Sequence, residues 1–251
     1  MLKRLIAKIV MQGDQIVNSY GFGEYLPLGK IEPTLKRLED WEIDEIVILQ
    51  ADHSEDPISD FCILKSNMGD LGLMTPMAYG GGITTVNQAK KIISLGADRV
   101  IVSACNGDFH YLIEEIGELL GDQSIILHLP ISSVFKQGVK SIKIEDLPKV
   151  LRCLNQSWGG ELLITDIESD GALDYNQRFF EDVQQNLLGF NFSYFGGICI
   201  DSDLNGILGS VNLSGICVGN NLHRIENPVF NFRRKMLGEF RNDTLDLANF
   251  S

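Results

Sequence analysis

The chain of 251 residues lacks three features that would assign it to a class at once. It has no run of about 18 apolar residues, so the sequence predicts no membrane-spanning helix. Its five cysteines never occur in C-x-x-C spacing, and its four histidines show no metal-ligand spacing. We therefore expect reduced thiols, a cytoplasmic location, and neither a metal site nor another cofactor.

Positive charge is scarce. The chain has 21 lysines and arginines against 34 aspartates and glutamates, which gives a net charge of −13. Surfaces that bind nucleic acid or anionic lipid need clustered positive charge, so neither is expected as a partner. An anionic ligand would have to be held by backbone N–H groups and a few local cations.

Short apolar runs alternate with longer amphipathic stretches, a pattern typical of repeated βα units and a parallel sheet. The expected strands are Arg4 to Met11, Glu45 to Gln50, Met74 to Ala78, Arg99 to Ser103, Ser124 to Leu129, Glu161 to Thr165, Phe190 to Phe195 and Gly215 to Val218. Eight such strands in a chain of about 250 residues predict an α/β fold, a (β/α)8 TIM barrel, as one domain over residues 1–251. The clearest helical spacing lies between Thr84 and Leu95.

Two glycine clusters stand half a chain apart, at Gly80 to Gly82 and at Gly196 to Gly197. Each follows a strand-like run and precedes a helical stretch, where bare backbone N–H groups suit an anion. Their corresponding positions predict two half-barrel repeats, at about residues 1–121 and 122–251, and a substrate with a phosphate at each end. The alternative is that these glycines only form tight turns.

Several motifs occur in the order and spacing of one known family. They are Glu45 to Leu49, Gly80 to Ile83, Leu95 to Val100, Gly121 to Ser124, Gly160 to Gly171 and Gly196 to Gly197. Up to about Asn221 the chain resembles the cyclase subunit of imidazole glycerol phosphate synthase (HisF), a lyase of histidine biosynthesis, and its paralogues encoded with surface-polysaccharide genes. The resemblance implies a barrel that receives ammonia from a glutaminase (HisH-like) subunit at its bottom. It also implies that the ammonia is used on a phosphorylated small-molecule substrate, a bis-phosphorylated ribonucleotide, at the top.

The resemblance implies two phosphate sites at the top of the barrel. The first would use Gly81, Gly82 and Ser103, with Ala104 beside them; the second would use Asp170, Gly171, Gly196, Gly197, Gly219 and Asn220. Ser103 and Ala104 stand where the family usually has Asn and Thr, so the first site has lost a hydroxyl donor. A weaker first site is expected.

The family's general acid and base are two aspartates at the ends of the first and fifth strands. The matching positions here are Val10 and Pro130, which transfer no proton. The lysine of the family's flexible loop falls on Asn18. Standard cyclisation is therefore not expected, and whether the chain is an enzyme stays open. The candidates left for catalysis are Lys8, His128 and Asp170.

The family closes the bottom of its barrel with a ring of basic and acidic side chains that gates ammonia. The positions that match this ring, or the neighbouring contact with the glutaminase, are Arg4, Glu45, Asp98, Arg99 and Glu161. Buried charge is costly unless paired, which favours a retained gate and partner face. The alternative is a purely structural plug.

If Arg4 of the matched ring points inward, alternation along the first strand places Lys8 inside the barrel, and the same alternation along the fifth strand places His128 there. An interior lysine must be paired or have a lowered pKa. One hypothesis is a new polar site made of Lys8, His128 and Thr165. The other is that Lys8 reaches Glu45 or Glu161 and enlarges the plug.

Two functions stay open from the sequence. The chain is either a HisF-like synthase subunit that pairs with a glutaminase and uses or conducts ammonia toward a phosphorylated ribosyl substrate, or a non-catalytic scaffold. The scaffold would dock a glutaminase that serves the amidination of a surface sugar by another enzyme.

Overall fold

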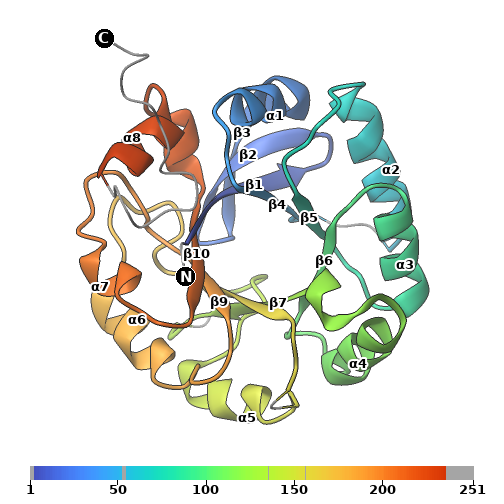
Figure 1. The fold of residues 1–251 in the computed structure, drawn as a ribbon, viewed down its shortest axis with the longest axis vertical. Coiled ribbons are helices and arrows are strands. Elements are labelled where there is room, and N and C mark those ends of the chain that lie inside the picture. The colour runs from blue at the N-terminus through green and yellow to red at the C-terminus, as the bar shows by residue number, and fades with distance from the viewer. Residues whose placement is uncertain (1–2, 53–54, 135, 156, 236–251) are drawn as a thin grey trace.

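The computed structural model describes residues 3–52, 55–134, 136–155 and 157–235. Its sheet has the order β10-β9-β8-β7-β6-β5-β4-β1-β2-β3, and a further pairing between β10 and β1 closes eight of the strands into a barrel. Neighbouring barrel strands are parallel. Seen along the barrel in Figure 1, the helices form an outer ring. The predicted (β/α)8 TIM barrel is confirmed.

The barrel strands lie close to their predicted positions. They are β1 (Arg4–Gln12), β4 (Glu45–Gln50), β5 (Met77–Gly80), β6 (Arg99–Ser103), β7 (Ile125–Ile131), β8 (Glu161–Asp166), β9 (Phe192–Phe195) and β10 (Leu213–Val218). The helices are α1 (Ile31–Asp40), α2 (Pro57–Met68), α3 (Val86–Ser94), α4 (Phe109–Leu120), α5 (Leu147–Leu151), α6 (Gln177–Gln184), α7 (Asn205–Leu208) and α8 (Pro228–Lys235). Short 3-10 turns are η1 (Asp122–Ser124), η2 (Ile144–Asp146) and η3 (Asn220–His223).

The predicted boundaries of α3 were slightly too wide, because a capping box fixes its start. The Thr85 hydroxyl accepts a hydrogen bond from the Gln88 backbone N–H at 3.3 Å, and the Gln88 side chain accepts one from the Thr85 N–H at 3.0 Å. The helix therefore begins at Val86 and not at Thr84.

Two apolar layers hold the barrel together. A large outer cluster packs the strands against the helices, and a smaller inner cluster fills the barrel itself. The inner cluster takes side chains from all eight barrel strands: Ile6, Val47, Leu49, Ala78, Ile101, Ile126, Leu163, Phe195 and Cys217. Because a barrel of eight strands leaves room for side chains only, its middle is an apolar core. The polar side chains inside the barrel lie toward its two ends, which we name the floor (amino ends of the strands) and the rim (carboxyl ends).

A strand pair interrupts the connection between β1 and α1. Strands β2 (Gln15–Tyr20) and β3 (Glu24–Lys30) form an antiparallel pair, and β2 also pairs with the end of β1. We call this pair the hairpin. The sequence analysis predicted no strand here. The hairpin bends over the rim, where the Gly21 N–H donates to the carbonyl of Asp170 at 3.1 Å.

Within the described ranges, every helix is too short or too polar to cross a membrane. The same ranges hold no cluster of three or more potential metal-ligating side chains. The predicted division into halves near residue 121 stays a prediction, and residues 236–251 lie outside the described part of the chain.

Candidate functional site

Four charged side chains close the floor of the barrel. Each of Arg4 and Arg99 forms ion pairs with both Glu45 and Glu161, and the bond from Arg99 to Glu161 measures 2.6 Å. The hydroxyl of Ser193 donates a further bond to Glu161. The sequence analysis predicted these four residues to lie together, and the structure brings them into one ring, the charged ring. Its role as an ammonia gate stays a prediction.

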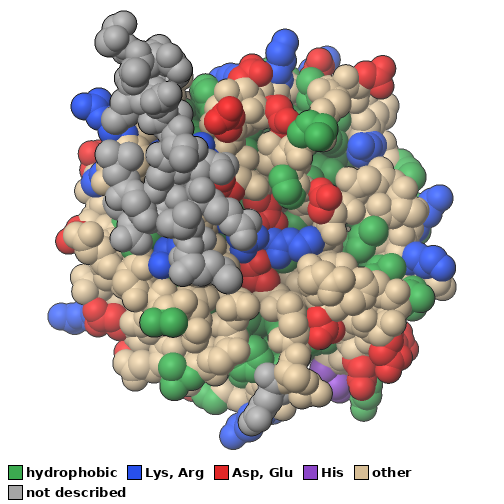
Figure 2. Space-filling view, in the orientation of Figure 1, with side chains coloured by type: hydrophobic (Ala, Val, Ile, Leu, Met, Phe, Trp, Pro, Cys, Tyr) green, Lys and Arg blue, Asp and Glu red, His purple; other side chains and the backbone are tan. Residues whose placement is uncertain are grey.

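The pairing favours the charged forms of Arg4, Arg99 and Glu161, although these side chains are largely buried. Burial by itself favours the neutral forms, yet the pKa of Arg4 is raised because Glu161 and Glu45 lie against it. Likewise burial opposes ionisation of Glu161, but Arg4 and Arg99 lower its pKa to about 2. In Figure 2, basic and acidic side chains gather near the middle of the visible face.

Asp98 stands beside the charged ring on an exposed loop. Its carboxylate accepts a bond from the backbone N–H of Met77 at 2.8 Å, which ties the loop before β6 to the start of β5. The residue therefore has a fixed position and an accessible side chain, as a contact residue on the floor requires.

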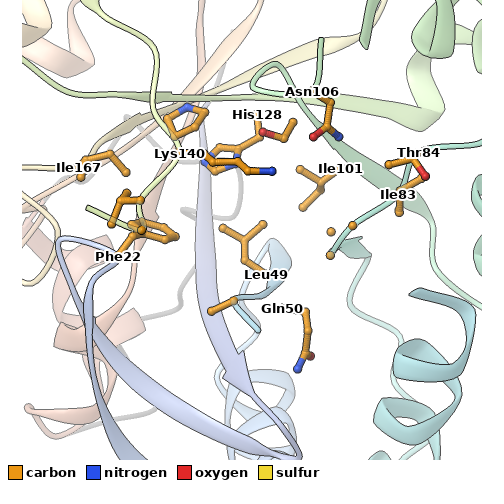
Figure 3. Close-up of a pocket in the computed structure, with 18 of the residues that line it drawn as sticks. Phe22, Leu49, Gln50, Ile83, Thr84, Ile101, Asn106, His128, Lys140 and Ile167 are labelled. Atoms are coloured by element: carbon orange, nitrogen blue, oxygen red, sulfur yellow. The ribbon is translucent and has the colours of Figure 1, made fainter. Parts of the chain in front are cut away.

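At the opposite end, a pocket of about 580 Å³ opens between the ends of β4, β5, β6 and β7. We call it the rim pocket. Its lining includes Gly80, Gly81, Gly82, Ser103, Asn106, Gln50, His128, Pro130 and Lys140. Figure 3 shows Ile83, Thr84 and Asn106 on one side of it, with Phe22 and Ile167 on the other. A pocket of this size and mixed lining suits a small ligand.

The first predicted phosphate site lies on one wall of this rim pocket. Gly82 has a φ of +67°, a conformation that favours glycine, and a Cβ on Gly81 would come within 2.6 Å of Gln50. The side chain of Gln88 accepts the N–H groups of Thr84 and Thr85. The N–H groups of Gly82 and Ile83 have no acceptor among the described residues. These two donors are therefore the ones an anion can use.

The residues of the second predicted phosphate site contact the hairpin instead of an open space. Asp170 accepts bonds from the Phe22 N–H at 3.1 Å and from the Ser19 hydroxyl. The side chain of Asn220 donates to the Ser19 carbonyl at 2.9 Å and accepts from the Ser19 N–H at 3.3 Å. A Cβ on Gly171 would lie only 2.8 Å from that same carbonyl.

The three remaining glycines of the second site are buried: Gly196, Gly197 and Gly219. A Cβ on Gly196 would lie 2.7 Å from the side chain of Asp166, and one on Gly219 would lie 3.0 Å from the ring of Phe195. Tight backbone packing therefore accounts for these glycines. None of the second set lines the rim pocket.

Lys8 lies inside the barrel with only 4% of its surface exposed. Its ammonium nitrogen is 3.4 Å from an Asp170 oxygen and stands over two aromatic rings, 3.6 Å from the centroid of Phe195 and 4.1 Å from that of Phe22. Burial lowers the pKa of Lys8 to about 8, with Asp170 opposing the shift. The expectation that Lys8 reaches Glu45 or Glu161 was wrong, because Asp170 pairs with it from the rim side.

His128 lies between Lys8 and the rim pocket. Its Nε2 atom is 2.9 Å from the hydroxyl of Thr165, and its ring centroid is 6.3 Å from that of Phe22. Burial, and then the charge of Lys8, lower the pKa of His128 to about 3, so the imidazole is neutral near pH 7. The structure thus brings together Lys8, His128 and Thr165, the group proposed as a new polar site, whose chemical role stays a prediction.

The positions of the family's acid and base hold no proton-transfer group. Val10 is buried at the end of β1, and Pro130 lines the rim pocket at the end of β7. The sequence analysis missed Gln50, Asn106 and Lys140 as pocket residues. Gln50 ends β4 and Asn106 follows β6, so their place at strand ends was an available signal; Lys140 stands in a loop with no such signal.

Comparison with known proteins gives the chain a family context. A family model described as "Histidine biosynthesis protein" matches residues 7–227. A putative imidazole glycerol phosphate synthase subunit hisF2 of Campylobacter jejuni subsp. jejuni serotype O:2 is 28% identical over 211 residues, which cover 81% of this chain and 83% of that protein. An imidazole glycerol phosphate synthase subunit HisF of Thermococcus gammatolerans is 26% identical over 178 residues, 68% of this chain and 70% of that protein.

A third relative, a putative imidazole glycerol phosphate synthase subunit hisF2 of Vibrio vulnificus, is 27% identical over 185 residues. These residues cover 68% of this chain and 65% of that protein, slightly less than two thirds of its length. The family match includes the hairpin and the rim pocket, and it begins three residues after Arg4 of the charged ring.

Proposed function

The chain belongs to the histidine biosynthesis protein family as a diverged member of the HisF type, and on that premise we propose that it is the barrel subunit of a glutamine amidotransferase. In this proposal a HisH-like glutaminase docks on the floor. A phosphorylated ribosyl ligand occupies the rim pocket, and the subunit acts as a synthase on that ligand.

The observation that carries the proposal is the character of the floor. The charged ring lies at its centre, and Asp98 stands exposed next to it. Three large apolar side chains are also exposed on the loops that lead into β5, β9 and β10: Met74 (85% exposed), Leu188 (78%) and Val211 (92%). These large exposed side chains stand at the same end of the barrel as Asp98, which supports this end as a contact surface for a protein.

The rim pocket supports the second part of the proposal. Two backbone donors on its wall have no acceptor among the described residues, and Lys140 and neutral polar side chains that suit sugar hydroxyl groups also line it. Its position at the carboxyl ends of the strands is where TIM-barrel enzymes carry their active sites.

A different observation favours the second candidate function, the non-catalytic docking scaffold. Val10 and Pro130 replace both proton-transfer residues of the family, and each such residue typically contributes about 10²–10⁴-fold to a rate. Lys8, with Phe195 and Phe22 around its ammonium, also fills the barrel between floor and rim. A scaffold would deliver ammonia, or glutaminase activation, to a separate enzyme that amidinates a surface sugar.

Glutamine hydrolysis by a HisH-type glutaminase from the same organism, with and without the chain, tests the docking. We expect at least tenfold stimulation, and loss of most of it in Asp98→Ala. Lys90→Ala, on the exposed face of α3, is the matched control and should stimulate normally. Absence of binding and of stimulation would overturn the proposal.

Ammonia-dependent turnover of the bis-phosphorylated ribonucleotide then separates the two candidate functions. Turnover by the purified, folded chain supports the synthase subunit. Stimulation of the glutaminase without turnover at high protein concentration supports the scaffold.

A further inference from the structure

We propose that Lys8 forms an imine with a small aldehyde or ketone that enters from the rim pocket, so that the chain binds a carbonyl compound covalently. The inference goes beyond the proposed function, because it needs neither a glutaminase nor a phosphate group. It gives a chemical role to a buried lysine that the synthase proposal leaves without one.

The ammonium group of Lys8 lies in surroundings that favour its neutral form. Its nitrogen is 3.6 Å from the ring centroid of Phe195 and 4.1 Å from that of Phe22. Within the described ranges its single ion pair is with Asp170, at 3.4 Å. Burial outweighs this one charge and lowers the pKa of Lys8 to about 8.

The lowered pKa makes Lys8 a nucleophile near neutral pH. At pH 7.5 a lysine with a pKa of about 8 is a neutral amine in about a quarter of the molecules, against about one in a thousand for an ordinary lysine. Two other titratable groups face it, Cys217 and His128. Burial raises the pKa of the Cys217 thiol, and the pKa of His128 is lowered to about 3, so both are uncharged near pH 7. A desolvated lysine of this kind is suited to imine formation with carbonyl compounds.

The inner end of the rim pocket lies against the barrel core, close to Lys8. Leu49 and Ile101 belong both to the pocket lining and to the inner apolar cluster. The ring of Phe22 lines the pocket, packs against the same cluster and contacts the Lys8 ammonium. His128 also lines the pocket, with its ring centroid 6.3 Å from that of Phe22. An aromatic side chain of the hairpin thus lies between the amine and the pocket.

The ring of Phe22 can move while the hairpin stays in place. The Phe22 N–H donates to Asp170 at 3.1 Å, and its carbonyl accepts the hydroxyl of Tyr25 at 2.8 Å, so the bonds hold the backbone and not the ring. Phe22 has a φ of +52°, which is rare for a bulky side chain, and strained residues of this type are concentrated at ligand-binding sites. The side chain is also partly exposed. We therefore expect the ring to rotate away from Lys8 and admit a small molecule.

Asp170 is placed to transfer the protons of imine formation. One of its oxygens faces the Lys8 nitrogen, while the other accepts the Ser19 hydroxyl and the Phe22 N–H. The neutral amine attacks the carbonyl carbon, the C–N bond forms, and the π electrons of the carbonyl move to its oxygen. That oxygen takes one amine proton by way of Asp170. The hydroxyl group then leaves as water with the second amine proton, and a C=N bond remains.

The lining of the rim pocket indicates which carbonyl compounds fit. Gln50 and Asn106 offer amide groups that can bond to hydroxyl groups. Ile101 and Ile167 supply apolar surface for a short carbon chain. A small sugar in its open-chain form carries hydroxyl groups together with one aldehyde or ketone, so open-chain sugars are the expected class.

Trapping with borohydride tests the inference. The purified chain is incubated with dihydroxyacetone, a small uncharged ketone, and sodium borohydride is added after short intervals to reduce any imine. Peptide mass spectrometry then gives the extent of reaction at each lysine. At pH 7.5 we expect Lys8 to react at least tenfold faster than Lys90, which is exposed on α3. The rate at Lys8 should rise with pH and level off above about pH 8, in line with its pKa.

Matched variants assign the reaction to this site. Lys8→Met should remove the fast phase of incorporation, and Lys90→Met should keep it. Phe22→Ala should raise the rate at Lys8 at least threefold, whereas Leu26→Ala, on the exposed surface of the hairpin, should leave it unchanged. Asp170→Asn should slow the reaction although it removes the charge that favours the ammonium form. A purely structural Asp170 would give a faster reaction in that variant.

Two results would overturn the inference. One is a rate at Lys8 no greater than that at Lys90. The other is reaction at Lys8 only in Phe22→Ala, because the ring would then be a fixed cover. The experiment contains neither a glutaminase nor a phosphorylated compound, so a failed docking test leaves this inference standing. In the same way, an unreactive Lys8 would leave the proposed function untouched.

Discussion

The floor and the rim of this barrel hold buried charge in two different ways. On the floor, two arginines share two glutamates, so each ion has two opposite neighbours and the pKa of Glu161 is lowered to about 2. Toward the rim, Lys8 has one carboxylate at 3.4 Å, and its pKa is lowered to about 8. At these two sites, the pKa of the buried ion follows the number of opposite charges around it: two favour the charged form of Glu161, whereas one does not offset the burial of Lys8.

The same contrast holds for resemblance to the family. The floor carries the expected charge at every matching position, whereas the rim has Val10 and Pro130 in place of acid and base and a hairpin bonded to Asp170. The floor, where a partner protein would bind, thus matches the family, whereas the rim, where a reaction would take place, differs from it. Four predictions can break or sharpen this contrast.

The largest expected effect concerns the floor. Glu45→Leu leaves Arg4 and Arg99 with one shared carboxylate and should lower the free energy of unfolding by about 3–5 kcal/mol. Asp98→Asn is the control, because the amide oxygen can still accept the Met77 N–H and the site is exposed; its cost should stay below about 0.5 kcal/mol. Urea unfolding measures both. A loss below about 1 kcal/mol for Glu45→Leu would mean that solvent already screens the ring.

The second effect concerns Lys8 and pH. Since the folded chain holds the pKa of Lys8 at about 8 against 10.5, the unfolded chain binds more protons between these values, and stability rises with pH there. Between pH 8 and 9.5 this amounts to about 2 kcal/mol at most. Lys8→Met should remove this rise, whereas Lys90→Met, on an exposed helix face, should keep it. An unchanged slope in Lys8→Met would show that the buried site titrates like an exposed one.

A smaller change in stability is expected below about pH 6.5, where His128 contributes. The pKa of His128 is lowered from 6.5 to about 3, so protonation of the unfolded chain reduces stability as pH falls from about 6.5. Because His128 is partly open to the rim pocket, we expect about 1 kcal/mol between pH 6.5 and 5. His128→Gln should remove this share. His223, whose pKa is lowered to about 4 by burial and by Arg37, should retain its own share in that variant.

The smallest expected effect is the contribution of Lys140 to ligand affinity. It is exposed, so Lys140→Ala should weaken binding of ribose 5-phosphate only two- to fivefold, consistent with about 0.5–1 kcal/mol for a screened ion pair. The difference should shrink in 0.5 M salt, and Lys149→Ala on α5 should show none. An effect that salt leaves unchanged would place Lys140 in a buried contact with the ligand.

Much of the fold follows from local pattern. Apolar runs placed all eight barrel strands, and alternation along β1 correctly put Lys8 on the same side as Arg4. The charged ring was predicted from the resemblance, which matched its four residues to a ring at the bottom of the family's barrels. The structure places all four at strand starts, where parallel strands bring their amino ends together.

The rim was harder to predict because its contacts join distant parts of the chain. The partner of Lys8 is Asp170, which comes 162 positions later, and alternation gives only the direction of a side chain and not its partner. The hairpin segment carries Asn18, Ser19 and several glycines, which weaken a strand pattern. The resemblance, which has a flexible loop at this place, pointed away from strands as well.

One strand of the hairpin has a consequence for the solution behaviour of the protein. A closed barrel has no free strand edge, but the sheet here ends on β3, a strand of seven residues that, within the described ranges, pairs with β2 only. Such an edge invites the strand of a second molecule. Pro27 in its middle lacks an N–H, and Glu24 and Lys30 put charges at its two ends. These three residues disfavour the addition of a strand from a second copy at the open edge beside the rim pocket.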